Sequence, residues 1–361
     1  MGRLGRASKV RVSWLAEMKG DRVCFVTLFL PEASPAAGSR LTDMPMALPP
    51  MALPLLVCSA LAATPVVYDG KIRDEGGGLS AAYMNPYSSD NHAATLEQLP
   101  DGSLVAAWFG REHEESSGTA IVVSRLAKGS DTWTNRTIVA QRDGYANGNP
   151  LLFYDSTTGT LHLWHTQVKA EAGEKEAKAH RLKSHDGGLV WSDEGQYFDD
   201  EGIYIRNRII RRKDGTLLWP YYTTDSHSNG RAPAFAFSKD TSVPTKGSGW
   251  SISTLDQGDA SLEQPTCWRQ PHDMGTIECY FRDHGDAKSI YSAKSKDEGK
   301  TFSNPKPTEL PNPDSGIEAY PLQNGDALCW MRLRMCVRQA RPNLFGCGSG
   351  SPASHCRVFV D

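Results

Sequence analysis

A short turn motif that recurs through the chain constrains its fold more than any other feature of the sequence. The motif reads SKDEGKTF at residues 295–302 and SHDGGLVW at residues 184–191, with Ser, Asp, Gly and an aromatic residue at one spacing. An Asp side chain accepts hydrogen bonds from nearby backbone N–H groups, and Gly adopts positive φ without steric cost. The terminal aromatic can fill an apolar gap beneath the turn. The motif therefore predicts a self-bonded hairpin loop, and no catalytic role is needed to explain it.

The motif belongs to an internal repeat. Poorer copies begin at Ser124 and Ser238. A second marker, a turn followed by apolar strand residues, recurs at a similar spacing. Its turn glycines are Gly102, Gly159, Gly215, Gly275 and Gly325. Two independent markers with a shared period of about 50 to 60 residues are typical of propeller blades. The sequence thus predicts an all-β propeller.

Composition agrees with this fold and narrows the partners. The chain has 33 Gly and 22 Pro, and no long segment shows the apolar period of a helix. The run KAEAGEKEAKAHRLK at residues 169–183 has no apolar face, which favours a solvated insertion that leads into a strand. With a net charge of −3, the chain offers no basic field for nucleic acid, and no stretch predicts a membrane span.

The N-terminal region has the pattern of a secretory signal. A short apolar run within residues 44–63 ends in small residues, with Ala60-Leu61-Ala62 as a cleavage site. Its prolines would break a membrane-spanning helix. We interpret residues 1–43 as a gene-model extension or a disordered arm and residues 44–63 as a signal peptide; the alternative is one transit-like arm. The sequon at Asn135 also fits a secreted protein.

The C-terminal region departs from the repeat after Leu328. Residues 329–361 hold four of the eight cysteines, and their spacing lacks the C-x-x-C pair typical of zinc sites. This tail is either a small appendage or a departure from the true coding sequence, and the second interpretation is favoured. The propeller then spans residues 64–328 and is truncated to about four to five blades. We expect no metal and no other cofactor.

The repeated turns resemble the Asp-boxes of the BNR-repeat, sialidase-like family. The resemblance covers residues 90–328 and is carried by the segments NHAATLEQLPDGSLVAAWFGREHE, GNPLLFYDSTTGTLHLWHT, IRNRIIRRKDGTLLWPYY and LPNPDSGIEAYPLQNGDAL. The family consists of six-bladed β-propellers and includes exo-sialidases. The resemblance therefore implies a glycoside hydrolase of exo-α-sialidase type that acts on the terminal acidic sugar of a glycan. Together with the signal-like segment this predicts a secreted protein, and we expect a monomer.

The resemblance also implies a set of site residues. Sialidases use a Tyr nucleophile activated by a Glu, because a carboxylate nucleophile would be repelled by the acidic sugar. Three arginines hold the substrate carboxylate, and an acid on a loop protonates the leaving oxygen. Glu263 and Arg282 match the activating Glu and the second arginine, on two strands of one predicted hairpin. The alternative interpretation is that they are a surface Glu and a strand-end Arg with no joint role.

Other family positions are matched less well. The loop GREHEESSG contains Arg111 and offers Glu114 or Glu115 as the acid. The family has an Asp at this place. The alternative is an acidic loop that is merely solvated. His92 stands in the place of the first clamp arginine, and His lacks the bidentate guanidinium fork. Arg206 and Arg208 either face the central cleft or are strand-end charges. The tail contains no recognisable third arginine or nucleophilic Tyr.

Three hypotheses for the function follow. The first is a sialidase-type hydrolase, inactive as this truncated chain; the second is a non-catalytic glycan-binding propeller. The third is a glycosidase of different sugar specificity, with His92 as a site residue. Independently of function, Cys267 and Cys279 flank one turn symmetrically, so we expect them to lie close together, with a disulfide as one option.

Overall fold

The computed structural model of the chain describes residues 67–76, 79–111, 117–170, 172–224, 231–270 and 273–321, together with strands at residues 15–16, 24–28, 327–331, 345–348 and 355–359. Within these residues the regular structure is β-strand apart from two short 3-10 helices, η1 (Glu174–Glu176) and η2 (Gly247–Gly249). No helix among them is long and apolar enough to cross a membrane. The predicted all-β fold is confirmed.

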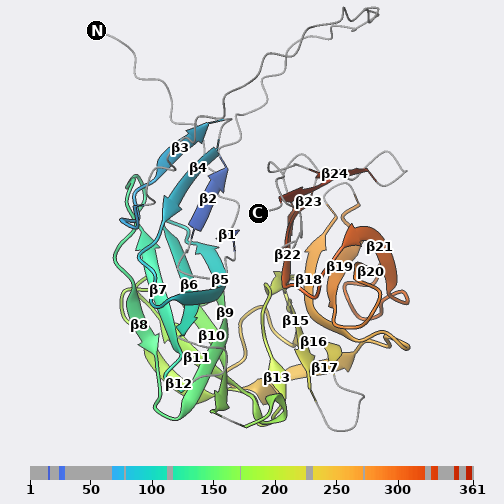
Figure 1. Cartoon of the computed structure of the whole chain (residues 1–361). Helices are drawn as coiled ribbons and strands as arrows, with labels where there is room; N and C mark the ends of the chain where they lie inside the picture. The colour runs from blue at the N-terminus through green and yellow to red at the C-terminus, as the bar shows by residue number, and fades with distance from the viewer. Residues whose placement is uncertain are drawn as a thin grey trace, which may run out of the picture.

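Four antiparallel sheets form the blades of a β-propeller and follow one another along the chain (Figure 1). The first blade contains β5 (Asp90–Gln98), β6 (Leu104–Arg111), β7 (Ala120–Leu126) and β8 (Thr137–Ala140). The second contains β9 (Tyr145–Asp155), β10 (Thr160–Lys169), β11 (Lys178–Ser184) and β12 (Ser192–Gln196).

The next two blades continue the same meander. The third contains β13 (Ile203–Tyr204), β14 (Ile210–Arg211), β15 (Leu217–Thr223), β16 (Ala232–Ser238) and β17 (Trp250–Thr254), and both β13 and β14 pair with β15. The fourth contains β18 (Leu262–Arg269), β19 (Ile277–Asp283), β20 (Ser289–Ser295) and β21 (Lys306–Pro311). Neighbouring blades meet through their inner strands: β5 packs beside β9, and β18 packs beside β15.

Two further sheets flank these blades. One has the strand order β1 (Leu15–Ala16), β2 (Cys24–Leu28), β4 (Leu79–Tyr83), β3 (Arg73–Gly76). The other has the order β22 (Ile317–Pro321), β23 (Ala327–Met331), β25 (His355–Phe359), β24 (Phe345–Gly348). It begins as an antiparallel hairpin, but β23 pairs with β25 in parallel. The antiparallel order of the blades is therefore interrupted within residues 329–361, the tail in which the sequence repeat ends. The predicted signal peptide at residues 44–63 lies outside the described residues.

The apolar core lies between neighbouring blades. Trp164 of the second blade and Trp219 of the third are both fully buried, with ring centroids 4.7 Å apart. Between the third and fourth blades, Leu218 packs with Phe281 in one cluster. Burial of each large apolar side chain stabilises the fold by about 1.5–3 kcal/mol. Inter-blade burial of this kind holds each sheet against the next, and this fixes the geometry of the inner strands.

The repeated turns have the structure that their sequence predicts. Ser295 Oγ donates to Asp297 Oδ1 at 2.8 Å, and the backbone N–H of Gly299 donates to Ser295 Oγ at 2.8 Å. The aromatic residue that ends the motif, Phe302, stacks on Phe235 of the preceding blade at 4.3 Å. The copy at residues 184–191 has the same Ser–Asp and Gly–Ser bonds. Both copies join the third strand of a blade to its fourth, so they lie on the outer side of the propeller.

The predicted proximity of the two cysteines is also confirmed. Cys267 on β18 and Cys279 on β19 are directly opposite in the strand register, and they form a disulfide with a Cα–Cα distance of 4.1 Å.

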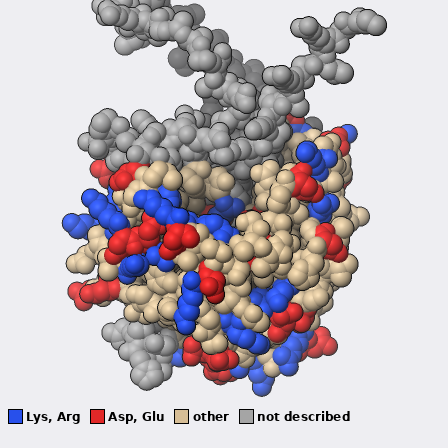
Figure 2. Space-filling model, turned by 180° about the vertical axis from the view of Figure 1, so that it is seen from behind, with Lys and Arg blue, Asp and Glu red and all other residues tan. Residues whose placement is uncertain are grey.

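The surface of the described residues carries charges of both signs. In Figure 2, Lys and Arg side chains alternate with Asp and Glu over the visible face, and neither sign forms a continuous field. This mixed pattern agrees with the small net charge of −3.

Candidate active site

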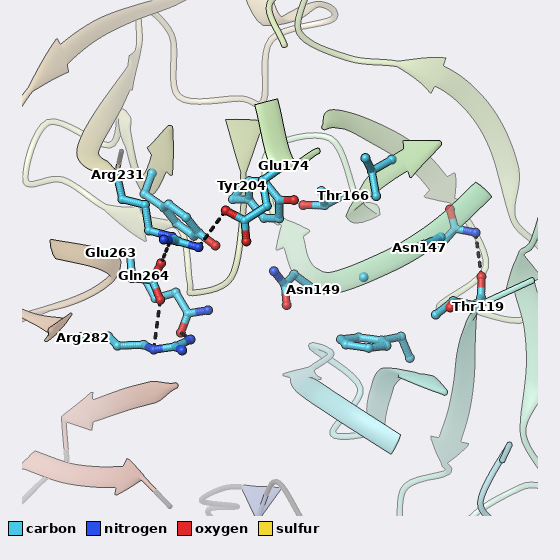
Figure 3. Close-up of a pocket in the computed structure, with 15 residues that line it drawn as sticks. Thr119, Asn147, Asn149, Thr166, Glu174, Tyr204, Arg231, Glu263, Gln264 and Arg282 are labelled. Carbon is cyan, nitrogen blue, oxygen red and sulfur yellow. Dashed lines mark hydrogen bonds and ion pairs between the residues drawn. The ribbon is translucent and has the colours of Figure 1, made fainter. Parts of the chain in front are cut away.

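A cavity of about 180 Å³ lies at the inner strands (Figure 3). The second, third and fourth blades provide most of its walls, and Phe109 and Thr119 of the first blade complete them. Its lining residues are Phe109, Thr119, Ala146, Asn147, Gly148, Asn149, Thr166, Val168, Glu174, Tyr204, Tyr222, Arg231, Glu263, Gln264 and Arg282.

A repeated backbone irregularity shapes this cavity. The register of the inner strand shifts in three blades, and near each shift one residue has positive φ: Ala93 (50°), Asn149 (49°) and Gln264 (49°). A β-bulge of this kind bends a strand and redirects its side chains, and a non-Gly residue with positive φ is strained. The residues just before the three strained positions are His92, Gly148 and Glu263, which therefore occupy equivalent places.

The central group of the cavity is the Glu263 carboxylate. Its side chain is only 3% exposed, and it lies between two arginines from different blades. Glu263 Oε2 is 2.6 Å from Arg231 Nε, and Glu263 Oε1 is 2.9 Å from Arg282 Nε. Burial raises the pKa of Glu263, and the charges of Arg282 and Arg231 only partly oppose this effect. A carboxyl group with a raised pKa can act as a proton donor near neutral pH.

Each arginine also contacts a second carboxylate. Arg231 Nη2 donates to Glu174 Oε2 at 2.7 Å, and Arg282 Nε donates to Asp314 Oδ1 at 2.9 Å. Two guanidinium groups are therefore surrounded by three carboxylates. The charges of both arginines are therefore paired within the protein. In a substrate clamp, by contrast, the arginines are paired by the carboxylate of the bound ligand.

The same cluster does not fit a bound metal ion. Ligand-type atoms of Glu263, His284 and Asp314 lie within 4.8 Å of one another. Arg282 Nε, however, contacts both carboxylates at 2.9 Å. The guanidinium thus already supplies the positive charge that a cation would bring.

Two stacked tyrosines also line the cavity. The rings of Tyr204 and Tyr222 have centroids 5.2 Å apart and are nearly parallel. Burial, followed by the negative charge of Glu263, raises the pKa of Tyr222 well above its ordinary value. Tyr222 is therefore held as a neutral phenol, and a phenol in this state is a poor nucleophile.

The opposite wall is lined by neutral polar groups. Asn147 is fully buried; its Nδ2 donates to Thr119 O at 2.8 Å, and its Oδ1 accepts from Gln167 Nε2 at 3.0 Å. The Thr166 hydroxyl is buried and has no hydrogen-bond partner among the described residues. In Figure 3, Asn149 lies between this wall and the charged group around Glu263. An unpaired buried hydroxyl in a cavity wall is costly unless a ligand or water completes it.

The structure brings together some of the residues that the sequence singles out. Glu263 and Arg282 are opposite in the register of β18 and β19 and form an ion pair. His92 lies beside the cavity, because its ring stacks on Phe109 at 5.5 Å and its Nε2 is 2.7 Å from Asp90 Oδ1. Glu114, Glu115 and the side chain of Arg111 lie outside the described residues. Their roles remain predictions.

Arg208 lies in a second polar cluster that links three sheets. Its guanidinium is 3.8 Å from Glu97 of the first blade and 3.6 Å from Glu318 on β22, and it covers the ring of Tyr320 at 4.6 Å. Arg206 acts electrostatically on Glu318 in the same cluster. Arg208 thus joins the first and third blades to β22, and it is not among the residues that line the cavity. A role for Arg206 or Arg208 in binding substrate stays a prediction.

Glu97 in this cluster predicts a specific pH dependence. Burial raises its pKa to about 7, although Arg208 and a backbone hydrogen bond from Tyr154 oppose the shift. Between about pH 4.5 and about pH 7, the folded state keeps a proton on Glu97 that the unfolded state has lost. The contribution of Glu97 to stability therefore falls as the pH rises through this range. Between pH 5 and pH 8 we expect Glu97→Gln to gain on the order of 2 kcal/mol in unfolding free energy relative to wild type. Urea unfolding at both pH values measures this gain, and a constant difference would contradict it.

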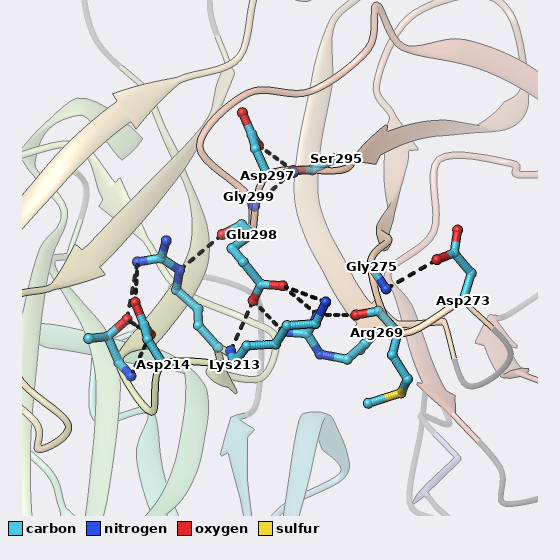
Figure 4. A network of polar contacts seen from close by, with 12 residues as sticks. Lys213, Asp214, Arg269, Asp273, Gly275, Ser295, Asp297, Glu298 and Gly299 are labelled. Atoms are coloured by element: carbon cyan, nitrogen blue, oxygen red, sulfur yellow. Dashed lines mark hydrogen bonds and ion pairs between the residues drawn. The ribbon is translucent and has the colours of Figure 1, made fainter.

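The turn motifs have a structural task away from the cavity (Figure 4). Glu298, within the motif at residues 295–302, accepts from Arg269 of its own blade at 2.8 Å. It also accepts from the backbone N–H of Lys213 in the third blade at 3.0 Å, and its carbonyl accepts from Arg212 Nε at 3.0 Å. The loop therefore fastens two blades to each other. None of the residues of this motif lines the cavity.

Sequence reasoning missed several of the lining residues. Arg231 directly precedes β16, Glu174 begins η1, and Tyr222 lies near the end of β15. A charged residue immediately before the apolar strand APAFAFS was the one available signal for Arg231. Glu174 lies in a run of charged residues that indicated a solvated segment. The sequence therefore contained no sign that its side chain lines the cavity.

Comparisons with known proteins agree with the fold. Residues 102–344 match the family model of the BNR repeat-like domain. No curated protein matches the chain significantly. A protein of unknown function from Dyadobacter fermentans is similar in structure, with a TM-score of 0.52 and 18% identity over 64% of this chain and 71% of that chain.

Two solved sialidase structures are also similar. For the intramolecular trans-sialidase from Ruminococcus gnavus the TM-score is 0.51, with 16% identity over 65% of this chain and 75% of that chain. For the NanB sialidase from Streptococcus pneumoniae it is 0.53, with 13% identity over 66% of this chain and 55% of that chain. At these identities the similarity concerns the fold.

Proposed function

Because the chain belongs to the BNR repeat-like domain family, in the sialidase superfamily, we propose that it is a glycoside hydrolase-like protein that binds the terminal sugar of a glycan in the cavity around Glu263. The observation that carries this proposal is a buried carboxylate held by arginines from two blades at the edge of a small polar cavity. A cavity of about 180 Å³ is smaller than the roughly 300–1,000 Å³ that suits drug-sized ligands. It is suited to a single sugar ring.

The lining has the chemistry that sugar recognition needs. Asn149, Gln264 and Thr166 offer neutral donors and acceptors for hydroxyl groups, and Glu174 and Glu263 offer carboxylate acceptors. Phe109, Tyr204 and Tyr222 provide aromatic surface for the apolar face of a ring. A few fixed polar groups among aromatic side chains are typical of small-molecule sites.

The charge distribution favours a neutral sugar over the acidic sugar that the sialidase resemblance implies. Arg231 and Arg282 are each paired with two carboxylates, and His92 stands where sialidases have their first clamp arginine. A substrate carboxylate would have to displace Glu174, Glu263 or Asp314 from these arginines. We therefore favour a glycosidase of different specificity, and we expect no turnover of sialosides.

A secretory route remains part of the proposal. The candidate signal peptide at residues 44–63 supports it, and so does the sequon residue Asn135, which is exposed. The Cys267–Cys279 disulfide agrees, because disulfides persist mainly in oxidising compartments.

A non-catalytic glycan-binding propeller is the second candidate. It is favoured by the ion pairs on both Glu263 oxygens, which could hold this group purely as a structural support. Both candidates require that a sugar enters the same cavity.

Filling the cavity tests sugar binding. Gly148 lines the cavity with ordinary φ, and an added Cβ would meet the Phe109 ring at 3.8 Å, an ordinary contact. We expect Gly148→Val to abolish the binding of purified protein to a glycan array while the fold is retained. Thr254→Val, at the exposed end of the outer strand β17, is the matched control and should bind like wild type. Equal binding by wild type and Gly148→Val would contradict the proposed site.

A further inference from the structure

We infer that Glu174 is a second catalytic carboxylate, which acts as the base opposite Glu263 in the hydrolysis of a neutral terminal glycoside. This inference rests on the proposed function and adds to it a reaction, a residue and a substrate class. It is carried by the way in which Glu174, Arg231 and Glu263 converge from three blades on one cavity.

The first argument is the shared guanidinium. Glu174 Oε2 lies 2.7 Å from Arg231 Nη2, and Glu263 Oε2 lies 2.6 Å from Arg231 Nε. The two carboxyl groups are therefore only one guanidinium apart, and both line the cavity. Figure 3 shows them on either side of Arg231. Two carboxylates near a scissile bond are the usual requirement for glycoside hydrolysis.

The second argument is that the position of Glu174 is fixed by other parts of the fold. Its backbone carbonyl accepts a hydrogen bond from Thr224 Oγ1 at 3.1 Å, which ties the start of η1 to the third blade. Ala177, just after η1, is fully buried. A merely solvated acidic insertion would not need either anchor. The neighbouring Glu176 of the same helix is exposed and does not line the cavity.

The third argument is that the two carboxylates have different surroundings. The Glu263 side chain is 3% exposed, whereas the Glu174 side chain is 36% exposed. Burial raises the pKa of Glu263, which suits the group that gives up a proton. Glu174 lines the cavity and is more than a third exposed, so a water molecule can reach it. Pairs of carboxyl groups in such unequal environments divide the roles of acid and base.

The fourth argument concerns the sugar. A carboxylate base close to the anomeric carbon would repel a substrate that carries its own carboxylate there. The two arginines of the cavity are already paired with Glu174, Glu263 and Asp314. Tyr222, whose raised pKa keeps it neutral, does not offer the alternative nucleophile. Both features favour a neutral sugar.

The reaction balances with water as the one co-reactant. The bond between the anomeric carbon and the glycosidic oxygen breaks, its electron pair goes to that oxygen, and the oxygen takes the proton of Glu263. The oxygen of a water molecule forms the new bond to the anomeric carbon, and Glu174 takes the proton that this water loses. Solvent returns one proton from Glu174 to Glu263, so that one water is consumed in each cycle.

The test uses the full chain and a panel of 4-methylumbelliferyl glycosides of neutral hexoses, deoxyhexoses and N-acetylhexosamines. We expect Glu174→Gln to lower kcat by about 10²- to 10⁴-fold with little change in KM. If Glu174 is the base, kcat of wild type should fall at low pH, and Glu174→Gln should remove this fall. Azide, a small anionic nucleophile, should partly restore turnover to Glu174→Ala. Glu176→Gln is the matched control and should keep wild-type kcat.

The opposing outcomes are distinct. If Glu174 only orients Arg231, Glu174→Gln should raise KM, keep the fall of kcat at low pH, and Glu174→Ala should not respond to azide; this result would overturn the inference. A lack of turnover by wild type on every neutral glycoside would also overturn it. In that case, array binding by wild type but not by Gly148→Val would leave the proposed sugar site intact. Loss of sugar binding in wild type would remove both.

Discussion

Replacing Arg282 with Met is expected to lower the unfolding free energy by about 3–5 kcal/mol at pH 7.5, because it leaves the Glu263 carboxylate buried with less compensation. Arg282 is 2.9 Å from both Glu263 and Asp314, so the substitution also exposes these two acids to each other. The loss should shrink at pH 5, since Glu263 already has a raised pKa and can take up a proton. Urea unfolding followed by tryptophan fluorescence measures both values.

A double variant controls for this prediction. Glu263→Gln combined with Arg282→Met removes the buried charge together with its partner, so it should be more stable than Arg282→Met alone. If Arg282→Met alone does not fold, recovery of folding in the double variant is the corresponding result. A loss below about 1 kcal/mol that does not change with pH would be typical of an exposed ion pair and would contradict the buried pair.

Replacing Glu263 with Gln is expected to lower kcat by about 10²- to 10⁴-fold without unfolding the protein. The side chain keeps its shape but can no longer donate a proton. The fold should be retained because each arginine keeps a carboxylate, Arg231 with Glu174 and Arg282 with Asp314. Glu309→Gln, on the exposed face of β21 in the same blade, is the control and should keep wild-type activity.

The parts of the structure that local physics decides could be predicted from the sequence. The Ser–Asp–Gly spacing specifies its own hydrogen bonds, so the turns at residues 184–191 and 295–302 and their period predict the blades. A hairpin places residues opposite each other when they are equally distant from its turn. This is why Cys267 and Cys279 meet. Glu263 comes opposite Arg282 because the bulge between Glu263 and Thr266 shifts the register by one residue.

The rest of the site depends on contacts between blades, which a strand pattern does not encode. Arg231 reaches Glu263 from the third blade, and Glu174 of the second blade reaches Arg231. The positions of these residues in the sequence give no sign of either contact. The strained bulges at Ala93, Asn149 and Gln264 lack the glycines that normally mark positive φ. Tertiary packing imposes these conformations, so the sequence alone indicated neither the bulges nor the neutral wall of the cavity.

Release of 4-methylumbelliferone from neutral glycosides and from the α-sialoside, by wild type and Glu263→Gln in parallel, tests the central claim most directly. The account predicts that wild type turns over at least one neutral glycoside, leaves the sialoside intact, and loses this activity in Glu263→Gln. Turnover of the sialoside in preference to every neutral glycoside would contradict the proposed specificity. Undiminished turnover by Glu263→Gln would show that the cavity around this carboxylate is not the active site.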